Sequence, residues 1–137
     1  KMYKNDGRVM SNFIIQALQN LPITIYGKGS QTRSFCYVDD LIDGIIRFMN
    51  TDNSITGPIN LGSNQEISIK DLAVKIINLT NSKSEIKFLK PVLDDPMQRK
   101  PDLKLAKKII GWDFDTKLDN GIKKTINFFK EKIDGLN

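Results

Sequence analysis

The sequence predicts an α/β fold in which short strands alternate with about five helices. Two hydrophobic patterns predict this fold: apolar residues recur at helical spacing in five segments, and short β-branched or aromatic runs lie between them. The composition agrees, because 39% hydrophobic and 27% charged residues in a chain of 137 are typical of a domain that buries its own core.

The first elements expected along the chain are a helix and two strands. Segment 8–20 has the spacing of a helix, which Pro22 ends because proline restricts the residue before it. The run 23–26 (ITIY) then predicts a strand, closed by the glycine-containing turn 27–30. Residues 34–38 (SFCYV) predict a second strand.

A second helix is predicted over 40–50, with Asp39 or Asp40 as its N-cap. Helical spacing predicts an inward apolar face on it, made of Leu41, Ile42, Ile45, Ile46 and Met49. Residues 58–61, which are followed by Gly62, predict a further short strand.

The third helix has a clear start signal. Ser68 can accept a hydrogen bond from the free first-turn amides, and apolar residues follow from Ile69 at helical spacing. Residues 85–89 alternate as a strand does. Residues 91–101 contain three prolines and no periodicity, so they predict an ordered loop without regular structure.

Two helices are predicted in the last third of the chain. Asp102 can cap a helix that runs through Ile110 and stops at Gly111, and Trp112 is expected to fill the core behind that helix end. A last helix over 118–133 is expected to bury one stripe, made of Leu118, Ile122, Ile126, Phe129 and Ile133.

Several kinds of site are excluded by what the sequence lacks. With no histidine and one cysteine, it offers no imidazole or thiolate zinc site and no Ser-His-Asp triad, and we expect no metal. It also lacks a G-x-G-x-x-G turn, a P-loop and a Tyr-x-x-x-Lys pair. We therefore expect no cofactor-binding residues within this chain.

The net charge of +5 arises from 21 basic and 16 acidic side chains, with the excess in the second half of the chain. Most of those lysines lie on polar faces of predicted helices, so we expect solvated surface and no nucleic-acid partner. No apolar run approaches the roughly 20 residues of a membrane span, and the polar first residues do not resemble a signal peptide. We expect no membrane partner and a cytoplasmic location.

Two arginines stand out as candidate anion-binding residues. Arg33 follows the glycine turn, and Arg99 lies in the proline-containing loop. A guanidinium binds a diphosphate or a carboxylate through two parallel hydrogen bonds, so two arginines converging on one cleft would form an anion site. The alternative is a local ion pair with a neighbouring aspartate; Asp94 and Asp95 offer too few ligands for a cation. Cys36 is expected to be buried and inert.

Five stretches of the sequence resemble the extended short-chain dehydrogenase/reductase family, and within it the UDP-glucuronate decarboxylases. The most specific strings are Gln-Thr-Arg-Ser-Phe, from Gln31, and Asp-Asp-Pro-x-x-Arg-Lys-Pro-Asp, from Asp94. The second string favours a decarboxylase over an epimerase or a 4,6-dehydratase. The matching stretches are 6–13, 24–41, 57–62, 94–102 and 111–112.

The resemblance implies that residues 1–137 form a single C-terminal, substrate-binding domain, the N-terminal Rossmann part that binds NAD being absent. The parent enzyme would convert UDP-glucuronate into UDP-xylose and CO₂ as a homodimer, and the chain alone would be inactive. A 4-epimerase fragment, a 4,6-dehydratase fragment and a non-catalytic nucleotide-sugar-binding or oligomerisation module remain open alternatives. Without the Rossmann part, the chain is expected to expose an apolar face.

The same resemblance implies roles for individual residues. Arg33 matches an arginine that contacts the diphosphate of the UDP-sugar. Arg99 matches one assigned to the sugar carboxylate and to proton donation, which makes it the catalytic candidate. The implied substrate-binding residues are Arg8, Thr24, Ile25, Tyr26, Arg33 and Arg99.

Overall fold

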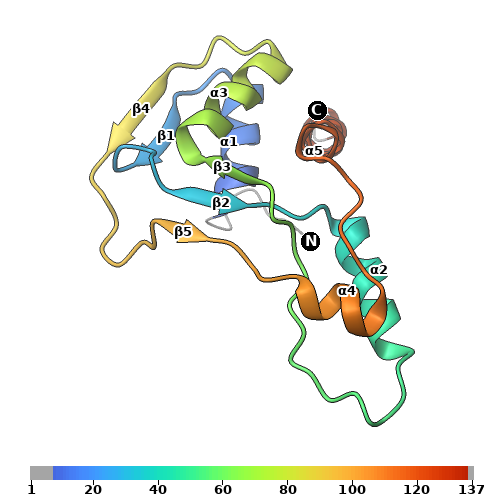
Figure 1. Ribbon diagram of the computed structural model, residues 1–137. Helices are drawn as coiled ribbons and strands as arrows, with labels where there is room; N and C mark the ends of the chain where they lie inside the picture. The colour runs from blue at the N-terminus through green and yellow to red at the C-terminus, as the bar shows by residue number, and fades with distance from the viewer. Residues whose placement is uncertain (1–7, 136–137) are drawn as a thin grey trace.

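The structure is a computed structural model that describes residues 8–135. These residues form five helices and five short strands, arranged as one two-stranded and one three-stranded sheet (Figure 1). The predicted α/β class with five helices and short strands is confirmed. No helix in this part of the chain is long and apolar enough to cross a membrane.

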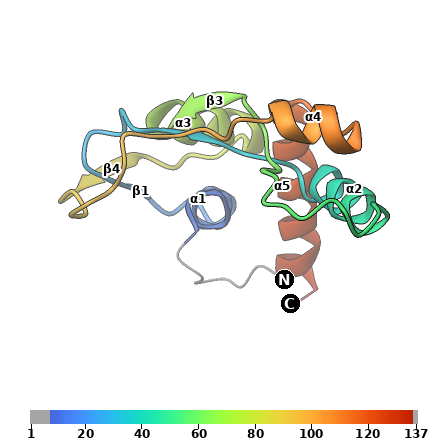
Figure 2. The same ribbon diagram turned by 60° about the horizontal axis from the view of Figure 1, so that its bottom comes forward.

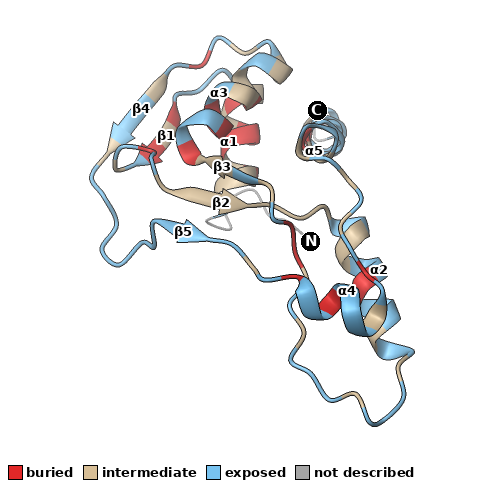
Figure 3. Cartoon of the chain, viewed as in Figure 1, coloured by how far each residue is buried: buried red, intermediate tan, exposed pale blue. Residues whose placement is uncertain are grey.

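The larger hydrophobic core is shared by three helices and a strand. Helices α1 (Val9–Leu18), α3 (Ile69–Thr80) and α5 (Leu118–Asp134) pack with β1 (Ile23–Tyr26), where the buried residues gather (Figure 3). These helices agree with the predicted ones. The buried members are Phe13, Ile14, Ile15, Ala17, Ile23, Ile25, Ile69, Leu72, Ala73, Ile76, Ile122, Ile126 and Phe129.

Strand β1 pairs in parallel with β4 (Ile86–Leu89), Ile23 lying beside Ile86. Both strands were predicted. The turn after β1 requires glycine, because Gly27 and Gly29 have φ angles of +80° and +76°. This turn leads directly into the second sheet.

The second sheet has the strand order β3-β2-β5, with β2 antiparallel to β3 and parallel to β5. Its strands are β2 (Thr32–Ser34), β3 (Glu66–Ser68) and β5 (Gln98–Arg99). The predicted strand 34–38 is therefore wrong: the strand lies earlier, because Phe35 leaves the sheet to pack on the larger core. The loop predicted over 91–101 contains a two-residue strand.

A smaller core joins α2 (Val38–Met49) and α4 (Lys104–Ile110), which lie side by side at the end of β5 (Figure 2). Trp112 is 1% exposed at its centre, and its indole Nε1 donates to the Asp40 carbonyl oxygen at 2.8 Å. The predicted role of Trp112 is confirmed. Gly111, with φ +60°, ends α4 as predicted.

The start of α2 differs from the prediction. Its N-cap position is Tyr37, and neither Asp39 nor Asp40 caps it. The Asp40 carboxylate accepts instead from the Thr116 amide at 2.8 Å and the Thr116 hydroxyl at 3.1 Å. This long-range contact ties α2 to the segment before α5. At α4, Asp102 accepts from the Lys104 amide at 3.0 Å, and the helix itself begins at Lys104.

The predicted inward face of α2 is wrong for four of its five residues, because Leu41 is half-buried and the others are exposed. Gly44 is its one buried residue, and a Cβ placed there would lie 3.0 Å from both Leu61 and Trp112. The helix therefore packs through its glycine side, and the apolar stripe faces away. The exposed fractions of that stripe are 48% for Ile42, 44% for Ile45, 51% for Ile46 and 74% for Met49.

The predicted strand over 58–61 is also wrong, because this segment is irregular. Pro58 has no amide to donate to a ladder, and Ile59 and Leu61 pack on the smaller core. Their apolar spacing reflects burial around Trp112 rather than strand pairing.

The cap at the start of α3 is confirmed, because the Ser68 hydroxyl accepts from the Asp71 amide at 3.1 Å. We expect Ser68→Ala to lower the free energy of unfolding by about 1 kcal/mol, since a first-turn amide loses its partner. Ser68→Asp, which restores an acceptor, is the control. Urea unfolding of the three proteins measures this difference, and equal stability of Ser68→Ala and wild type would contradict it.

Candidate functional site

The two candidate arginines lie side by side in the three-stranded sheet. Arg33 in β2 and Arg99 in β5 are register partners on adjacent parallel strands. Side chains at one register position on neighbouring strands stand on the same face of a sheet. The fold therefore places these two arginines on one face of adjacent strands, although they are far apart in the sequence.

The Arg33 side chain is held by three hydrogen bonds and is 15% exposed. Its Nη1 donates to the carbonyl oxygens of Thr32 at 2.7 Å and of Pro96 at 2.8 Å, and its Nη2 donates to the Asp95 carboxylate. The local ion pair with an aspartate nearby in the sequence, which was the alternative left open, is not what Arg33 forms, because Asp95 lies 62 residues further along the chain. A guanidinium carries five N–H donors, so these three hydrogen bonds do not use all of them.

Gln31 connects this ion pair to the end of β1. Its side-chain amide donates to the Tyr26 carbonyl oxygen at 3.2 Å and to the Asp95 carboxylate at 3.3 Å. Tyr26, Arg33 and Asp95 therefore belong to one connected cluster. The sequence reasoning gave Gln31 no role of its own, because only the fold brings Asp95 to it.

The three candidate substrate-binding residues in β1 differ in how far their side chains are exposed to solvent. Ile25 is 1% exposed within the larger core, so its backbone alone can reach a ligand. Thr24 is half-buried, its hydroxyl accepting from the Gln16 amide at 3.0 Å. Tyr26, at 53% exposed, presents its side chain to solvent.

Arg99 contrasts with Arg33. It is exposed, and within residues 8–135 its side chain makes no hydrogen bond or ion pair. Its guanidinium is therefore open to a ligand, while its position depends on the strand that carries it.

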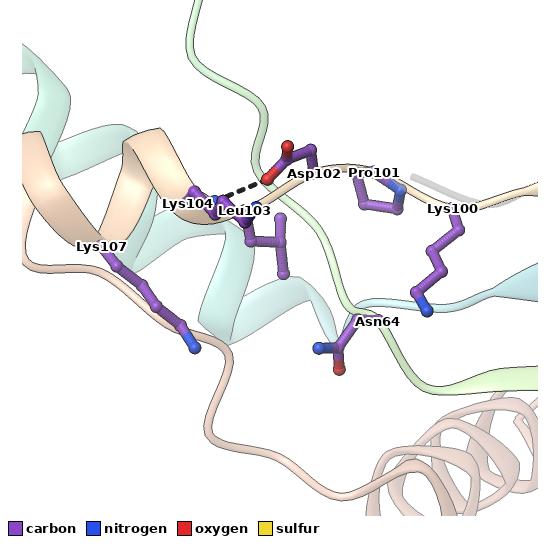
Figure 4. A pocket seen from close by; sticks show the side chains of 7 residues that line it. All are labelled: Asn64, Lys100, Pro101, Asp102, Leu103, Lys104 and Lys107. Atoms are coloured by element: carbon purple, nitrogen blue, oxygen red, sulfur yellow. Dashed lines mark hydrogen bonds between the residues drawn. The ribbon is translucent and has the colours of Figure 1, made fainter.

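A cavity of about 490 Å³ is lined in part by Lys100, the residue after Arg99 (Figure 4). Lys100 and Lys107 contribute ammonium groups to it, at 3.6 Å from Glu66 and 3.0 Å from Asp113 respectively. Because side chains alternate along an extended segment, Lys100 stands on the face opposite Arg99. We therefore do not assign this cavity to the arginine cluster.

Arg8 lies at a second cavity, of about 420 Å³, between residues 35–38 and α5. Neither Arg33 nor Arg99 lines this cavity, so Arg8 does not join their cluster. Cys36 also lines it and is half-buried, so the prediction that this residue is buried is wrong. Burial raises the pKa of the Cys36 thiol, and the Asp40 carboxylate raises it further, which keeps the thiol protonated.

Within the described part of the chain, no group of three or more Cys, Asp and Glu residues could hold a metal ion. The site chemistry available is that of guanidinium, amide and carboxylate groups.

Comparison with known proteins shows which family the chain resembles. Residues 2–62 match the model of the NAD dependent epimerase/dehydratase family. Over 134 residues, the chain is 46% identical to UDP-glucuronic acid decarboxylase 1 of Xenopus tropicalis, covering 98% of this chain and 31% of that protein. Over residues 2–62 the chain is therefore similar to the NAD dependent epimerase/dehydratase family.

Two further proteins are also similar to this chain. UDP-glucuronic acid decarboxylase 5 of Arabidopsis thaliana is 47% identical over 122 residues, which cover 89% of this chain and 35% of that protein. The solved UDP-glucuronic acid 4-epimerase of Bacillus cereus, in complex with UDP-glucuronic acid and NAD, is 29% identical with a TM-score of 0.86. The match covers 92% of this chain and 40% of that one.

The chain therefore spans about a third of the length of the curated relatives it matches. The expected resemblance to extended short-chain dehydrogenases is confirmed, and the proteins that the chain is similar to are named as nucleotide-sugar decarboxylases and an epimerase.

The family name implies NAD as a cofactor, but the described residues lack the features of a dinucleotide-binding site. The turn containing Gly27 and Gly29 leads into strand β2, whereas a dinucleotide-binding turn opens a helix whose N-terminus holds the pyrophosphate. We therefore derive no chemical step through NAD from these residues.

Proposed function

We propose that this chain is the single, C-terminal, substrate-binding part of a UDP-glucuronate decarboxylase, a carboxy-lyase that forms UDP-xylose and CO₂. The observation that carries the proposal is the registered pair Arg33 and Arg99, in a chain 46% identical to a protein named for that activity. The epimerase alternative has weaker support, because the solved epimerase is 29% identical.

In this proposal the two arginines divide the charges of the substrate. Arg33, held by Asp95 and Pro96, binds the diphosphate with its remaining donors. Tyr26 and the backbone of Thr24 and Ile25 line the nucleotide end of the site. Their support is the Gln31 link between Tyr26 and the Asp95 that pairs with Arg33.

Arg99 is proposed to bind the sugar carboxylate, because its guanidinium is exposed and uncommitted in the described structure. When the bond between C5 and the carboxylate of a 4-keto sugar breaks, the electron pair passes to an enolate. A guanidinium beside it stabilises that charge, and Arg99 is also proposed to deliver the proton to C5. Arg8 is proposed to approach the nucleotide from the second cavity.

NAD is proposed to bind to a Rossmann part that packs on this chain in the full-length enzyme. The support is the exposed apolar stripe of α2, which continues from Val38 into the cavity between residues 35–38 and α5. Homodimer formation and a cytoplasmic location belong to the same proposal, as does the inactivity of the chain alone.

A product assay of the full-length enzyme tests the reaction. Incubation with UDP-glucuronate and NAD is expected to release CO₂ and form UDP-xylose. Formation of UDP-galacturonate would identify an epimerase, and a 4-keto-6-deoxy sugar formed from a UDP-hexose would identify a dehydratase. UDP binding without any product would favour the non-catalytic module.

The α2 stripe makes a separate prediction for the chain alone. We expect it to self-associate through this stripe, and Ile46→Glu, at a residue 51% exposed, to shift it to monomer with unchanged circular dichroism. Lys123→Glu on α5 is the control for added negative charge. Sedimentation velocity measures the mass, and self-association that survives Ile46→Glu would contradict the prediction.

A further inference from the structure

We propose that Glu66 is a positioning residue for Arg99, acting as a clamp on strand β5 from the opposite face of the sheet. This inference rests on the proposed role of Arg99 in the function above. Neither the family comparison nor the sequence motifs single out Glu66.

The Glu66 carboxylate contacts the residues on both sides of Arg99. Its Oε1 accepts from the Gln98 side-chain amide and, at 3.1 Å, from the Thr32 hydroxyl of β2. Its Oε2 lies 3.6 Å from the Lys100 ammonium. One side chain of β3 therefore reaches across β2 and contacts both sequence neighbours of Arg99, namely Gln98 in β5 and Lys100 just after it.

The clamp leaves Arg99 itself free. Side chains alternate along a strand, so Gln98 and Lys100 share the face of Glu66 while Arg99 stands on the other face. Thr32 and Arg33 are divided between the two faces in the same way. The carboxylate thus holds the strand without competing for the guanidinium that would bind the substrate.

Strand β5 needs such a clamp because little else holds it. It has two residues, lies at the edge of the sheet, and belongs to a segment, 91–100, in which every residue is exposed. Since the Arg99 side chain has no partner among the described residues, its position depends entirely on this backbone. Arg33 anchors the segment earlier, at Asp95 and Pro96.

Glu66 is ionised at neutral pH, so it attracts Lys100 in addition to accepting the two hydrogen bonds. The Gln98 hydrogen bond, followed by that of Thr32 and the charge of Lys100, lowers the pKa of this carboxyl despite its partial desolvation. A neutral glutamine could still accept from Gln98 and Thr32 through its amide oxygen. It would lose only the attraction to Lys100.

The test uses Glu66→Ala and Glu66→Gln in the full-length enzyme, with Glu131→Ala on α5 as the matched control. We expect Glu66→Ala to lower turnover of UDP-glucuronate by about 10²-fold through misplacement of Arg99. UDP, which lacks the sugar carboxylate, should bind to it as to wild type. Glu66→Gln should recover most of the activity, and Glu131→Ala should not change it.

A double variant separates positioning from general destabilisation. In an Arg99→Ala background, Glu66→Ala should lower turnover no further, because both changes remove one function. Independent, multiplying effects, or a parallel loss of UDP affinity, would overturn the proposal.

Hydrogen exchange tests the clamp even if the enzyme proves to catalyse another reaction. In Glu66→Ala, amides of residues 97–100 should exchange faster while those of β1 remain unchanged. Unchanged exchange in 97–100 would overturn the clamp, whereas absence of CO₂ release by wild type would overturn only the proposed function.

Discussion

Replacing Arg33 by alanine is expected to weaken the binding of UDP-glucuronate to the full-length enzyme by about two to four orders of magnitude. Two charge-assisted hydrogen bonds to the diphosphate would be lost, at about 1.5–3 kcal/mol each, and each 1.4 kcal/mol is about tenfold in affinity. The loss is near the upper end if Asp95 stays in place. Its carboxylate, now paired only with Gln31, would then stand uncompensated beside the dianionic diphosphate.

The matched control is Arg33→Lys, which keeps the charge and loses the planar fork. Lysine cannot donate to Thr32, Pro96 and Asp95 while also offering two parallel donors, so we expect an intermediate affinity. Calorimetry with UDP and the KM for UDP-glucuronate measure the effect. A folded Arg33→Ala enzyme with wild-type UDP affinity would show that Arg33 serves only as a structural ion pair.

The elements that could be predicted from the sequence are those whose signals are local. Helical spacing is repeated over several turns in α1, α3 and α5, and Ser68 and Gly111 mark helix ends through their own chemistry. Strand β1 was equally clear, because four consecutive β-branched or aromatic residues are bounded by Pro22 and a glycine turn. Neighbours in sequence decide each of these features.

The wrong predictions share a different cause. An apolar pattern in the sequence does not show which other part of the chain will pack against it. The stripe of Ile42, Ile45 and Ile46 has the spacing of a core face, yet the helix packs through Gly44. Ile59 and Leu61 are apolar because they pack on the core around Trp112. In both places the deciding contact lies far along the chain.

The site was predictable in its residues and not in its connections. Guanidinium chemistry and the family strings pointed to Arg33 and Arg99, but their register pairing depends on a two-residue strand inside a loop that contains prolines. Gln31 and Glu66 carry no motif of their own in the sequence. They acquire roles only when the fold brings Asp95 and Gln98 to them.

The second large effect is expected at Trp112, where Trp112→Ala should lower the free energy of unfolding by about 3–5 kcal/mol. The smaller core has three fully buried hydrophobic residues, Leu103, Ala106 and Trp112, so the indole supplies most of its buried surface. Domains are stable by about 5–15 kcal/mol in total, and this loss is a large share of that. For a chain of this length we expect the melting temperature to fall by about 10–20 °C.

Trp112→Phe separates packing from hydrogen bonding. Phenylalanine keeps an aromatic ring against Gly44 and loses the 2.8 Å hydrogen bond to the Asp40 carbonyl oxygen. The stability of Trp112→Phe should therefore lie between that of wild type and that of Trp112→Ala. Thermal unfolding followed by circular dichroism measures all three, since Trp112 is the chain's one tryptophan and its fluorescence disappears with it.

The effect should also be uneven across the molecule. Trp112 touches α2 and α4, whereas β1, α1 and α3 belong to the larger core. Hydrogen exchange in Trp112→Ala should therefore rise first in α2 and α4. Uniform acceleration in both cores would show that the two cores unfold as one cooperative unit, and an unchanged melting temperature would show that Trp112 does not hold the smaller core together.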